Sequence, residues 1–84
     1  MIAIFPFMNI TLFVTKNCPA CERLKLQVEL LLRNRKDINI TIEDLQKTRP
    51  EGIVIVPALF INDELYSYGE IDEVKFMEKV GIAN

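Results

Sequence analysis

The stretch TKNCPAC (residues 15–21) holds both cysteines of this 84-residue chain. A Cys-x-x-Cys pair can be a redox couple, half of a zinc site, a metal-carrier loop or a structural disulfide. The preceding segment NITLFVT (9–15) is rich in β-branched and aromatic residues and too short for a helix, so it predicts a buried strand. Cys18 then stands at a helix N-cap position with Pro19 at the first helical position, which predicts a helix running to about residues 33–35. The cysteine pair is therefore expected at a junction between a strand and a helix.

The composition predicts one small folded domain. Half of the residues are hydrophobic and 26% are charged, and the net charge of −2 gives no electrostatic reason to expect a nucleic-acid partner. The segment MIAIFPF (1–7) has no basic region and no small-residue cleavage site, and it is too short to span a bilayer. We interpret it as a short apolar extension of a single domain over residues 8–84. We expect no membrane partner and a cytoplasmic location, where a lone cysteine pair is more often catalytic or metal-binding than structural.

The helix after the cysteines shows two apolar faces. One stripe at helical spacing is formed by Leu24, Val28, Leu31 and Leu32, with Cys21 on the same side. This stripe is expected to pack on the sheet, which leaves Leu26 and Leu30 on the opposite face. Either the apolar extension or a second subunit of a homodimer covers these two leucines, or they are tolerated as scattered surface residues.

The rest of the chain predicts three more strands: INITIEDL (38–45), ALFI (58–61) directly after Pro57, and ELYSY (64–68), the last two joined by a tight turn at ND (62–63). Asp44 is expected to cap a short helical turn that Pro50 ends, so the second helix is shortened. Ser67 and Glu70 form a capping-box pattern, which predicts that the last helix starts there. Its apolar stripe is expected at Ile71, Val74, Met77 and Val80, with Gly81 as the stop. The order β-α-β and then β-β-α predicts an α/β fold, a mixed four-stranded sheet with helices packed on it.

These motifs together carry a family likeness. A strand, CPAC (18–21) and a helix, followed at a distance by VPALFIND (56–63) and a terminal helix, resemble the thioredoxin fold over residues 8–81. The chain is most similar to small glutaredoxin-like or minimal thioredoxin-like proteins. The resemblance implies that the Val56–Pro57 bond is cis and lies beside the dithiol. It also implies that the backbone of Val56 faces an extended substrate and offers strand-like pairing.

The chain departs from the family pattern at several positions. Leu12 stands where thioredoxins proper carry a buried acidic residue, and Asn17 stands where they carry a tryptophan. Tyr68 and Gly69 replace the glycine pair of glutaredoxins that bind glutathione. The missing acid at Leu12 suggests slower proton transfer to the second cysteine than in thioredoxins proper.

The chemistry of the pair predicts distinct roles for the two thiols. Unpaired backbone N–H groups of Ala20 and Cys21, together with the helix dipole, favour negative charge at Cys18 and lower its pKa. We therefore expect Cys18 to be the nucleophile and Cys21, one turn into the helix, to be the resolving thiol. Lys16 either adds a positive charge near Cys18 or is simply solvated.

The expected substrate contacts, beyond the two cysteines, are Lys16, Pro19, Ala20, Val56 and the cis Pro57. Glu70 and Asp72 place negative charge where the carboxylate of glutathione would bind, at the start of the last helix. We therefore expect a dithiol–disulfide oxidoreductase, without a cofactor, that reduces or exchanges disulfides and favours protein substrates over glutathione. Its expected partners are disulfide-bearing proteins and either a thioredoxin-reductase-type reductant or glutathione.

A metal-binding function is the rival interpretation. Two cysteines and no histidine exclude a cysteine–histidine zinc site within one chain, which needs about four ligands. A dimer that pools four cysteines, or a glutathione-linked iron–sulfur cluster, remains open.

Overall fold

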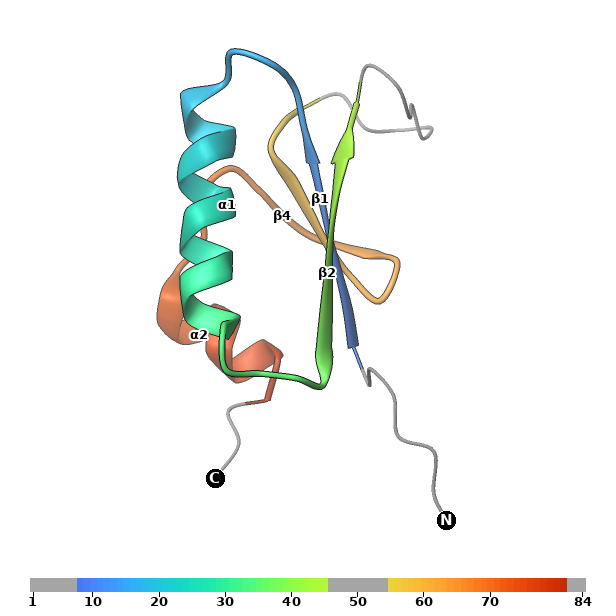
Figure 1. The fold of residues 1–84 in the computed structure, drawn as a ribbon, viewed down its shortest axis with the longest axis vertical. Helices are drawn as coiled ribbons and strands as arrows, with labels where there is room; N and C mark the ends of the chain where they lie inside the picture. The colour runs from blue at the N-terminus through green and yellow to red at the C-terminus, as the bar shows by residue number, and fades with distance from the viewer. Residues whose placement is uncertain (1–7, 46–54, 82–84) are drawn as a thin grey trace.

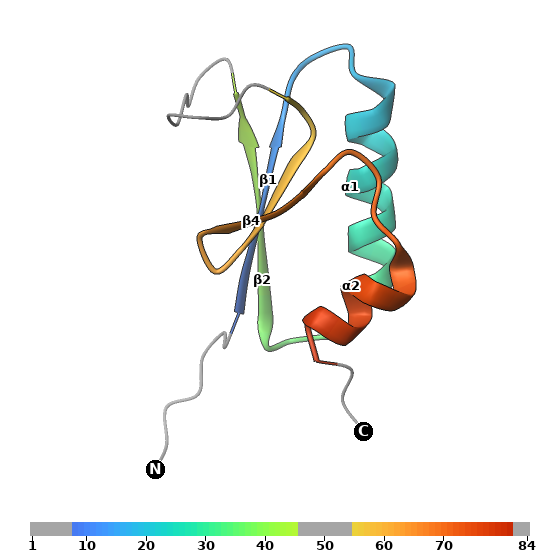
Figure 2. The same cartoon turned by 180° about the vertical axis from the view of Figure 1, so that it is seen from behind.

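The computed structural model describes residues 8–45 and 55–81, which form four strands and two helices. The elements in chain order are β1 (Met8–Val14), α1 (Pro19–Leu32), β2 (Ile38–Asp44), β3 (Ala58–Ile61), β4 (Glu64–Tyr68) and α2 (Glu73–Lys79). The strands form one sheet in the order β2-β1-β3-β4. β1 and β2 are parallel, whereas β3 is antiparallel to both β1 and β4. Both helices lie on the same face of this sheet (Figures 1 and 2). The predicted mixed four-stranded α/β fold is confirmed.

The main core lies between this face of the sheet and the helices. α1 is buried along the side formed by Cys21, Leu24, Val28 and Leu32, as its apolar stripe predicts. The three aliphatic side chains of this set belong to one cluster with fully buried residues of the central strands, such as Ile10, Leu12 and Leu59. Phe76 of α2 is fully buried in this core, and its ring lies edge-on to that of Tyr66 of β4, with 5.9 Å between the ring centroids. The apolar face of each helix therefore fixes how it sits on the sheet.

The strand register brings three chain segments to one end of the sheet. At this end β1 finishes beside the last residue of β2, because Val14 pairs with Asp44. β3 starts at the same end, because Ala58 pairs with Phe13. Pro57 directly precedes β3, and its carbonyl accepts a hydrogen bond of 2.8 Å from the N–H of Gly69. The loop that carries the cysteines also leaves β1 here.

The tight turn between β3 and β4 is confirmed at Asn62 and Asp63. Both residues have positive φ, 51° and 70°, as a two-residue hairpin turn of type I′ requires. The side chain of Asn62 also accepts the N–H of Asn9 at 2.8 Å, which ties the turn to the start of β1.

The predicted start of the last helix is wrong. Ser67 lies inside β4, where it pairs with Leu59, and the N-cap is Asp72, whose carboxylate accepts the N–H of Lys75 at 3.1 Å. The chain leaves the strand at Gly69, which has a φ of 73°. Because the ladder with β3 uses the backbone of Ser67, that residue is not available to start a helix.

The predicted apolar stripe of this helix is also partly wrong. Val74 is 67% exposed, whereas Phe76 and Val80 are buried and Ile71 and Met77 pack against the core. A helix that begins at Glu73 turns its i, i+4 pair Phe76 and Val80 toward the sheet, which leaves Val74 on the outside. The stop at Gly81 is confirmed, since this residue has a φ of 80°. The first helix ends at Leu32, slightly before residues 33–35.

Two sequence-based predictions lie outside the described residues. They are the apolar extension at residues 1–7 and the short helical turn between Asp44 and Pro50. Among the described residues, no helix has the length and apolar character needed to cross a membrane.

Candidate functional site

The two cysteines lie at the junction of β1 and α1, as the sequence predicts. After Val14 the chain makes a turn in which Asn17 has a φ of 55°, a left-handed conformation that asparagine tolerates better than most residues. Cys18 follows with extended backbone angles and is the N-cap of α1, and Pro19 occupies the first turn. The missing N–H of Pro19 costs nothing there, because the first N–H groups of a helix have no partner within it.

The geometry of the pair distinguishes its two sulfur atoms. Cys18 and Cys21 form a disulfide across one helical turn, with their Cα atoms 5.2 Å apart. Sγ of Cys18 also accepts the backbone N–H of Cys21 at 3.0 Å. Cys18 is partly exposed, whereas Cys21 is 1% exposed on the buried side of α1. One sulfur of the disulfide therefore reaches solvent and the other belongs to the interior.

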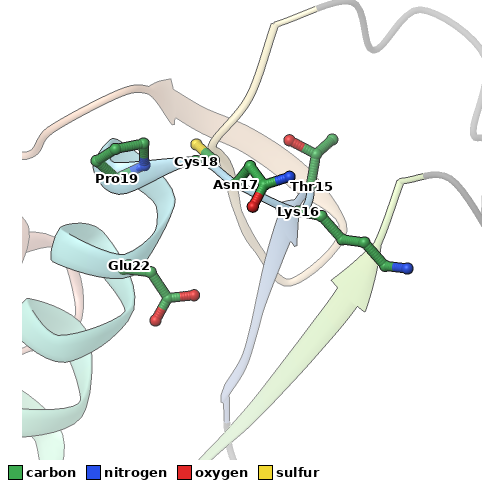
Figure 3. A pocket seen from close by; sticks show the side chains of 6 residues that line it. All are labelled: Thr15, Lys16, Asn17, Cys18, Pro19 and Glu22. Carbon is green, nitrogen blue, oxygen red and sulfur yellow. The ribbon is translucent and has the colours of Figure 1, made fainter.

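An open pocket of 530 Å³ lies beside Cys18 and is lined by Thr15, Lys16, Asn17, Cys18, Pro19 and Glu22. Figure 3 shows the carboxylate of Glu22 projecting from the first turn of α1, while the side chain of Lys16 extends away from Cys18. The backbone N–H of Glu22 is bonded to the carbonyl of Cys18 at 3.1 Å, which is the first helical hydrogen bond. The residues that line the pocket therefore include one positive and one negative side chain, and that of Lys16 is directed away from the sulfur of Cys18.

The structure brings together only part of the predicted site. Lys16 and Pro19 line the pocket, whereas Ala20 is half-buried in the first turn of α1 and is not among the lining residues. Sequence reasoning did not select Glu22 and Asn17. The signal for Glu22 was its position four residues after Cys18, one helical turn along.

The Val56–Pro57 bond is cis, as the resemblance implies. Pro57 is buried at the end of the sheet from which the cysteine loop departs, but it is not among the residues that line the pocket. Val56 is half-buried and packs against a small cluster around Phe13 and Ala58. Val56 and Pro57 therefore lie directly before β3, at the end of the sheet where the cysteine loop leaves β1.

Among the described residues, the structure buries no acid that could serve as a base for Cys21. Leu12 is fully buried in the core, and within residues 8–45 and 55–81 no polar or charged residue is buried. In the same part of the chain, no three side chains of cysteine, aspartate or glutamate come together as potential metal ligands.

Two acidic residues at the start of α2 are engaged by other groups. Glu70 forms an exposed ion pair with Arg23 of α1, with 3.2 Å between Oε2 and Nε. Glu73 accepts a hydrogen bond of 3.1 Å from Gln27, one turn further along α1. Both contacts connect the outer part of α1 with the start of α2.

Comparison with known proteins agrees with this geometry. A family model described as a thioredoxin domain matches residues 8–81, from the start of β1 to the stop after α2. The chain belongs to the thioredoxin-domain family. No curated protein sequence matches this thioredoxin domain.

Solved thioredoxin structures resemble the domain in fold. Spinach chloroplast thioredoxin f has a TM-score of 0.70 at 20% identity, over 93% of this chain and 71% of the spinach chain. Thioredoxin f2 of Chlamydomonas reinhardtii has a TM-score of 0.72 at 14% identity, over 95% and 84% of the two chains. A chloroplastic thioredoxin z reaches 0.75 at 18% identity, over 92% and 78%. The thioredoxin fold and the Cys18–Cys21 pair together support a thiol–disulfide oxidoreductase in general.

Proposed function

We propose that this thioredoxin domain reduces or exchanges disulfides of protein substrates, with Cys18 as nucleophile and Cys21 as resolving thiol. The observation that carries the proposal is the asymmetry of the pair. Cys18 is partly exposed beside a pocket at a helix N-terminus, and Cys21 is 1% exposed behind it. The N–H of Cys21 points at Sγ of Cys18 and, with the helix dipole, favours a thiolate at that atom.

Two exchange steps transfer the electrons. The Cys18 thiolate attacks one sulfur of the substrate disulfide, so that a Cys18–substrate S–S bond forms and the other substrate sulfur leaves as a thiolate that takes up a proton. Cys21 then loses its proton, and its thiolate attacks Sγ of Cys18 and expels the second substrate thiolate. Two electrons pass from the dithiol to the substrate, and the product is the Cys18–Cys21 disulfide, the form found in the structure. A thioredoxin-reductase-type enzyme or glutathione supplies two electrons to restore the dithiol.

Proton loss from Cys21 is expected to be the slower step at neutral pH. The Cys21 thiol is 1% exposed, and burial disfavours the charged thiolate that the second step requires. Leu12 stands where thioredoxins proper carry a buried acidic residue, and it lies in the core. We therefore propose that water entering from the pocket accepts this proton.

A preference for protein substrates over glutathione is supported by the start of α2. The sequence suggests that Glu70 and Asp72 repel the carboxylate of glutathione, but Glu70 is paired with Arg23. The stronger argument is that the carboxylate of Asp72 already accepts the N–H of Lys75 in the first turn of α2. Such N–H groups at the start of a helix are the kind of donor that binds an anion. A glutathione carboxylate would have to displace it. An open pocket bordered by both signs of charge places no such demand on an extended peptide. The proposed location is the cytoplasm.

The rival function is a dimer that holds a metal ion or an iron–sulfur cluster through four cysteines. Each chain contributes two thiolates from CPAC, so the rival requires that two Cys18–Cys21 pairs face each other. Metal content and visible absorbance of protein purified without oxygen separate the two functions. A bound metal at one equivalent per two chains would favour the rival.

The test of the proposed roles uses single serine variants. With a disulfide-bonded protein as substrate, Cys21→Ser is expected to accumulate a mixed disulfide on residue 18, visible by mass spectrometry, because the resolving thiol is missing. Cys18→Ser is expected to form no adduct and to lose turnover. Alkylation of the reduced wild-type protein at neutral pH should modify Cys18 first. An adduct on Cys21 in the Cys18→Ser variant, or faster alkylation of Cys21, would contradict the assignment.

A further inference from the structure

The outward side of α1 carries two large apolar side chains that the dithiol site does not use. Leu26 is 57% exposed and Leu30 is 63% exposed, and they lie one turn apart on the side opposite to the buried stripe. Large exposed apolar residues that form a patch on one face, rather than occurring singly, commonly mark an interaction surface.

A charged residue lies beyond each end of this leucine pair on the same side of α1. Arg23 and Arg33 lie one turn before Leu26 and one turn after Leu30, in the alternating three- and four-residue spacing of a helix–helix seam. We call the four residues Arg23, Leu26, Leu30 and Arg33 the outer face of α1. Glu22 and Glu29 are exposed along one border of it. The outer face is therefore apolar in the middle and charged at its ends.

We propose that two copies of this chain associate through their outer faces, with the two α1 helices antiparallel about a two-fold axis. The axis passes between Leu26 and Leu30, so that Leu26 of one copy packs against Leu30 of the partner subunit, and the reverse. An antiparallel pairing of this kind buries all four leucines in one contact, as a self-complementary interface requires.

The charges at the ends of the outer face fit this register. Glu22 of one copy lies at nearly the same level as Arg33 of the partner subunit, and the two-fold axis makes this opposite-charge pair occur twice. Arg23 lies at that level as well, but it is already paired with Glu70 of its own chain at 3.2 Å. One like-charge contact is also expected, because Glu29 lies near Glu29 of the partner subunit at the centre of the border. Because the two like charges repel, removing this contact is expected to strengthen the dimer.

A second copy fits the outer face better than a bound substrate does. Leu26 lies eight residues beyond Cys18, about 12 Å along the helix axis at 1.5 Å per residue. A peptide held at Cys18 has no need to reach it. In the proposed dimer the two Cys18 residues lie near opposite ends of the paired helices, about 30 Å apart along the axis. The arrangement does not bring the two cysteine pairs together, so it differs from the dimer of the metal-binding rival.

The test is the oligomeric state of the full chain, measured by sedimentation equilibrium over a range of concentrations. Wild-type protein is expected to show a concentration-dependent dimer. The double variant Leu26→Lys with Leu30→Lys is expected to weaken dimerisation at least 100-fold. Val74→Lys is the matched control, because Val74 is equally exposed on α2 but lies outside the outer face. It should leave the dimer unchanged. Far-UV circular dichroism verifies that each variant is folded.

Charge-exchange variants test the register itself. Glu22→Arg alone and Arg33→Glu alone are each expected to weaken dimerisation about 10-fold, since two ion pairs are lost and like charges are introduced. The double exchange should restore wild-type affinity, and Glu29→Gln should strengthen the dimer. Wild-type protein that stays monomeric at all concentrations would overturn the proposal, and so would a dimer that survives the two lysines or a double exchange without recovery. None of these measurements depends on the redox activity, so the result is independent of the proposed function.

Discussion

The replacement Phe76→Ala is predicted to remove a large part of the stability of the domain. Phe76 is 0% exposed in the core and stands edge-on to Tyr66. It is the buried residue within α2, a helix of seven residues. Isolated helices shorter than about 12 residues are marginal in water, so α2 depends on this packing.

The expected loss follows from the burial of Phe76. A buried Phe→Ala change costs about 3–5 kcal/mol, through the lost transfer free energy and the cavity that remains. A domain of 84 residues has a total unfolding free energy of about 4–13 kcal/mol at the usual values per residue. The expected loss is therefore between about a quarter of the total and all of it, and a domain at the lower end of this range would unfold at 25 °C.

The assay is urea denaturation of the oxidised protein, followed by far-UV circular dichroism. With the usual dependence on urea, the midpoint should fall by at least about 1 M. Val74→Ala is the control on the same helix and should change the unfolding free energy by less than about 0.5 kcal/mol, because Val74 is exposed. If Phe76→Ala and Val74→Ala have equal midpoints, the role of Phe76 in holding α2 on the sheet is refuted.

Three further predictions concern the site and its surroundings. Asn17→Val should lower the unfolding free energy by about 1–2 kcal/mol, because Asn17 is held at a φ of 55°, whereas Asn17→Gly should not; thermal unfolding of the two variants checks the difference. Two hydrogen bonds from Arg35 lower the pKa of Asp37, so the folded-state pKa lies below the unfolded one. This stabilisation is complete above the unfolded-state pKa of Asp37 and is lost as the pH falls through its folded-state pKa. Below about pH 4 the urea midpoint should therefore fall more steeply with decreasing pH in wild type than in Asp37→Asn. Equal dependence of the two midpoints on pH would contradict this prediction. Asp72→Ala should lower the KM for a glutathione mixed disulfide, because it frees the N–H of Lys75. Asp72→Asn keeps the cap but removes the charge, so it separates the two effects. An unchanged KM in both variants would remove this explanation for weak glutathione binding.

The residues around the cysteine pair were predictable because their conformation depends on near neighbours. Cys18 at the N-cap and Pro19 in the first turn follow from the hydrogen-bonding needs of a helix start, and the structure has both. The hairpin turn at Asn62 and Asp63 follows in the same way from residues that tolerate positive φ. Each of these features is decided within a few residues of chain.

The start of the last helix was decided by tertiary structure. Ser67 and Glu70 satisfy a local capping rule, but the backbone of Ser67 pairs with Leu59, and Glu70 pairs with Arg23, which lies 47 residues away. A cap contributes about 1 kcal/mol, whereas leaving the strand early would break ladder hydrogen bonds and expose part of the core. The strand therefore continues to Tyr68, and the helix begins only after Asp72.

The residues around the pocket show the same difference between features set by local sequence and features set by tertiary structure. Sequence alone placed the thiols, since a helix N-terminus and a buried stripe are local patterns, and it placed Leu26 and Leu30 on the outer side of α1. Only the folded chain shows that Glu70, before α2, is already paired and that Glu22 and Lys16 line the same pocket as Cys18. Spacing along the chain determines which side of an element a residue occupies. The partner it meets there depends on how the elements pack, because burial and pairing between distant residues outweigh local preferences of a few tenths of a kcal/mol.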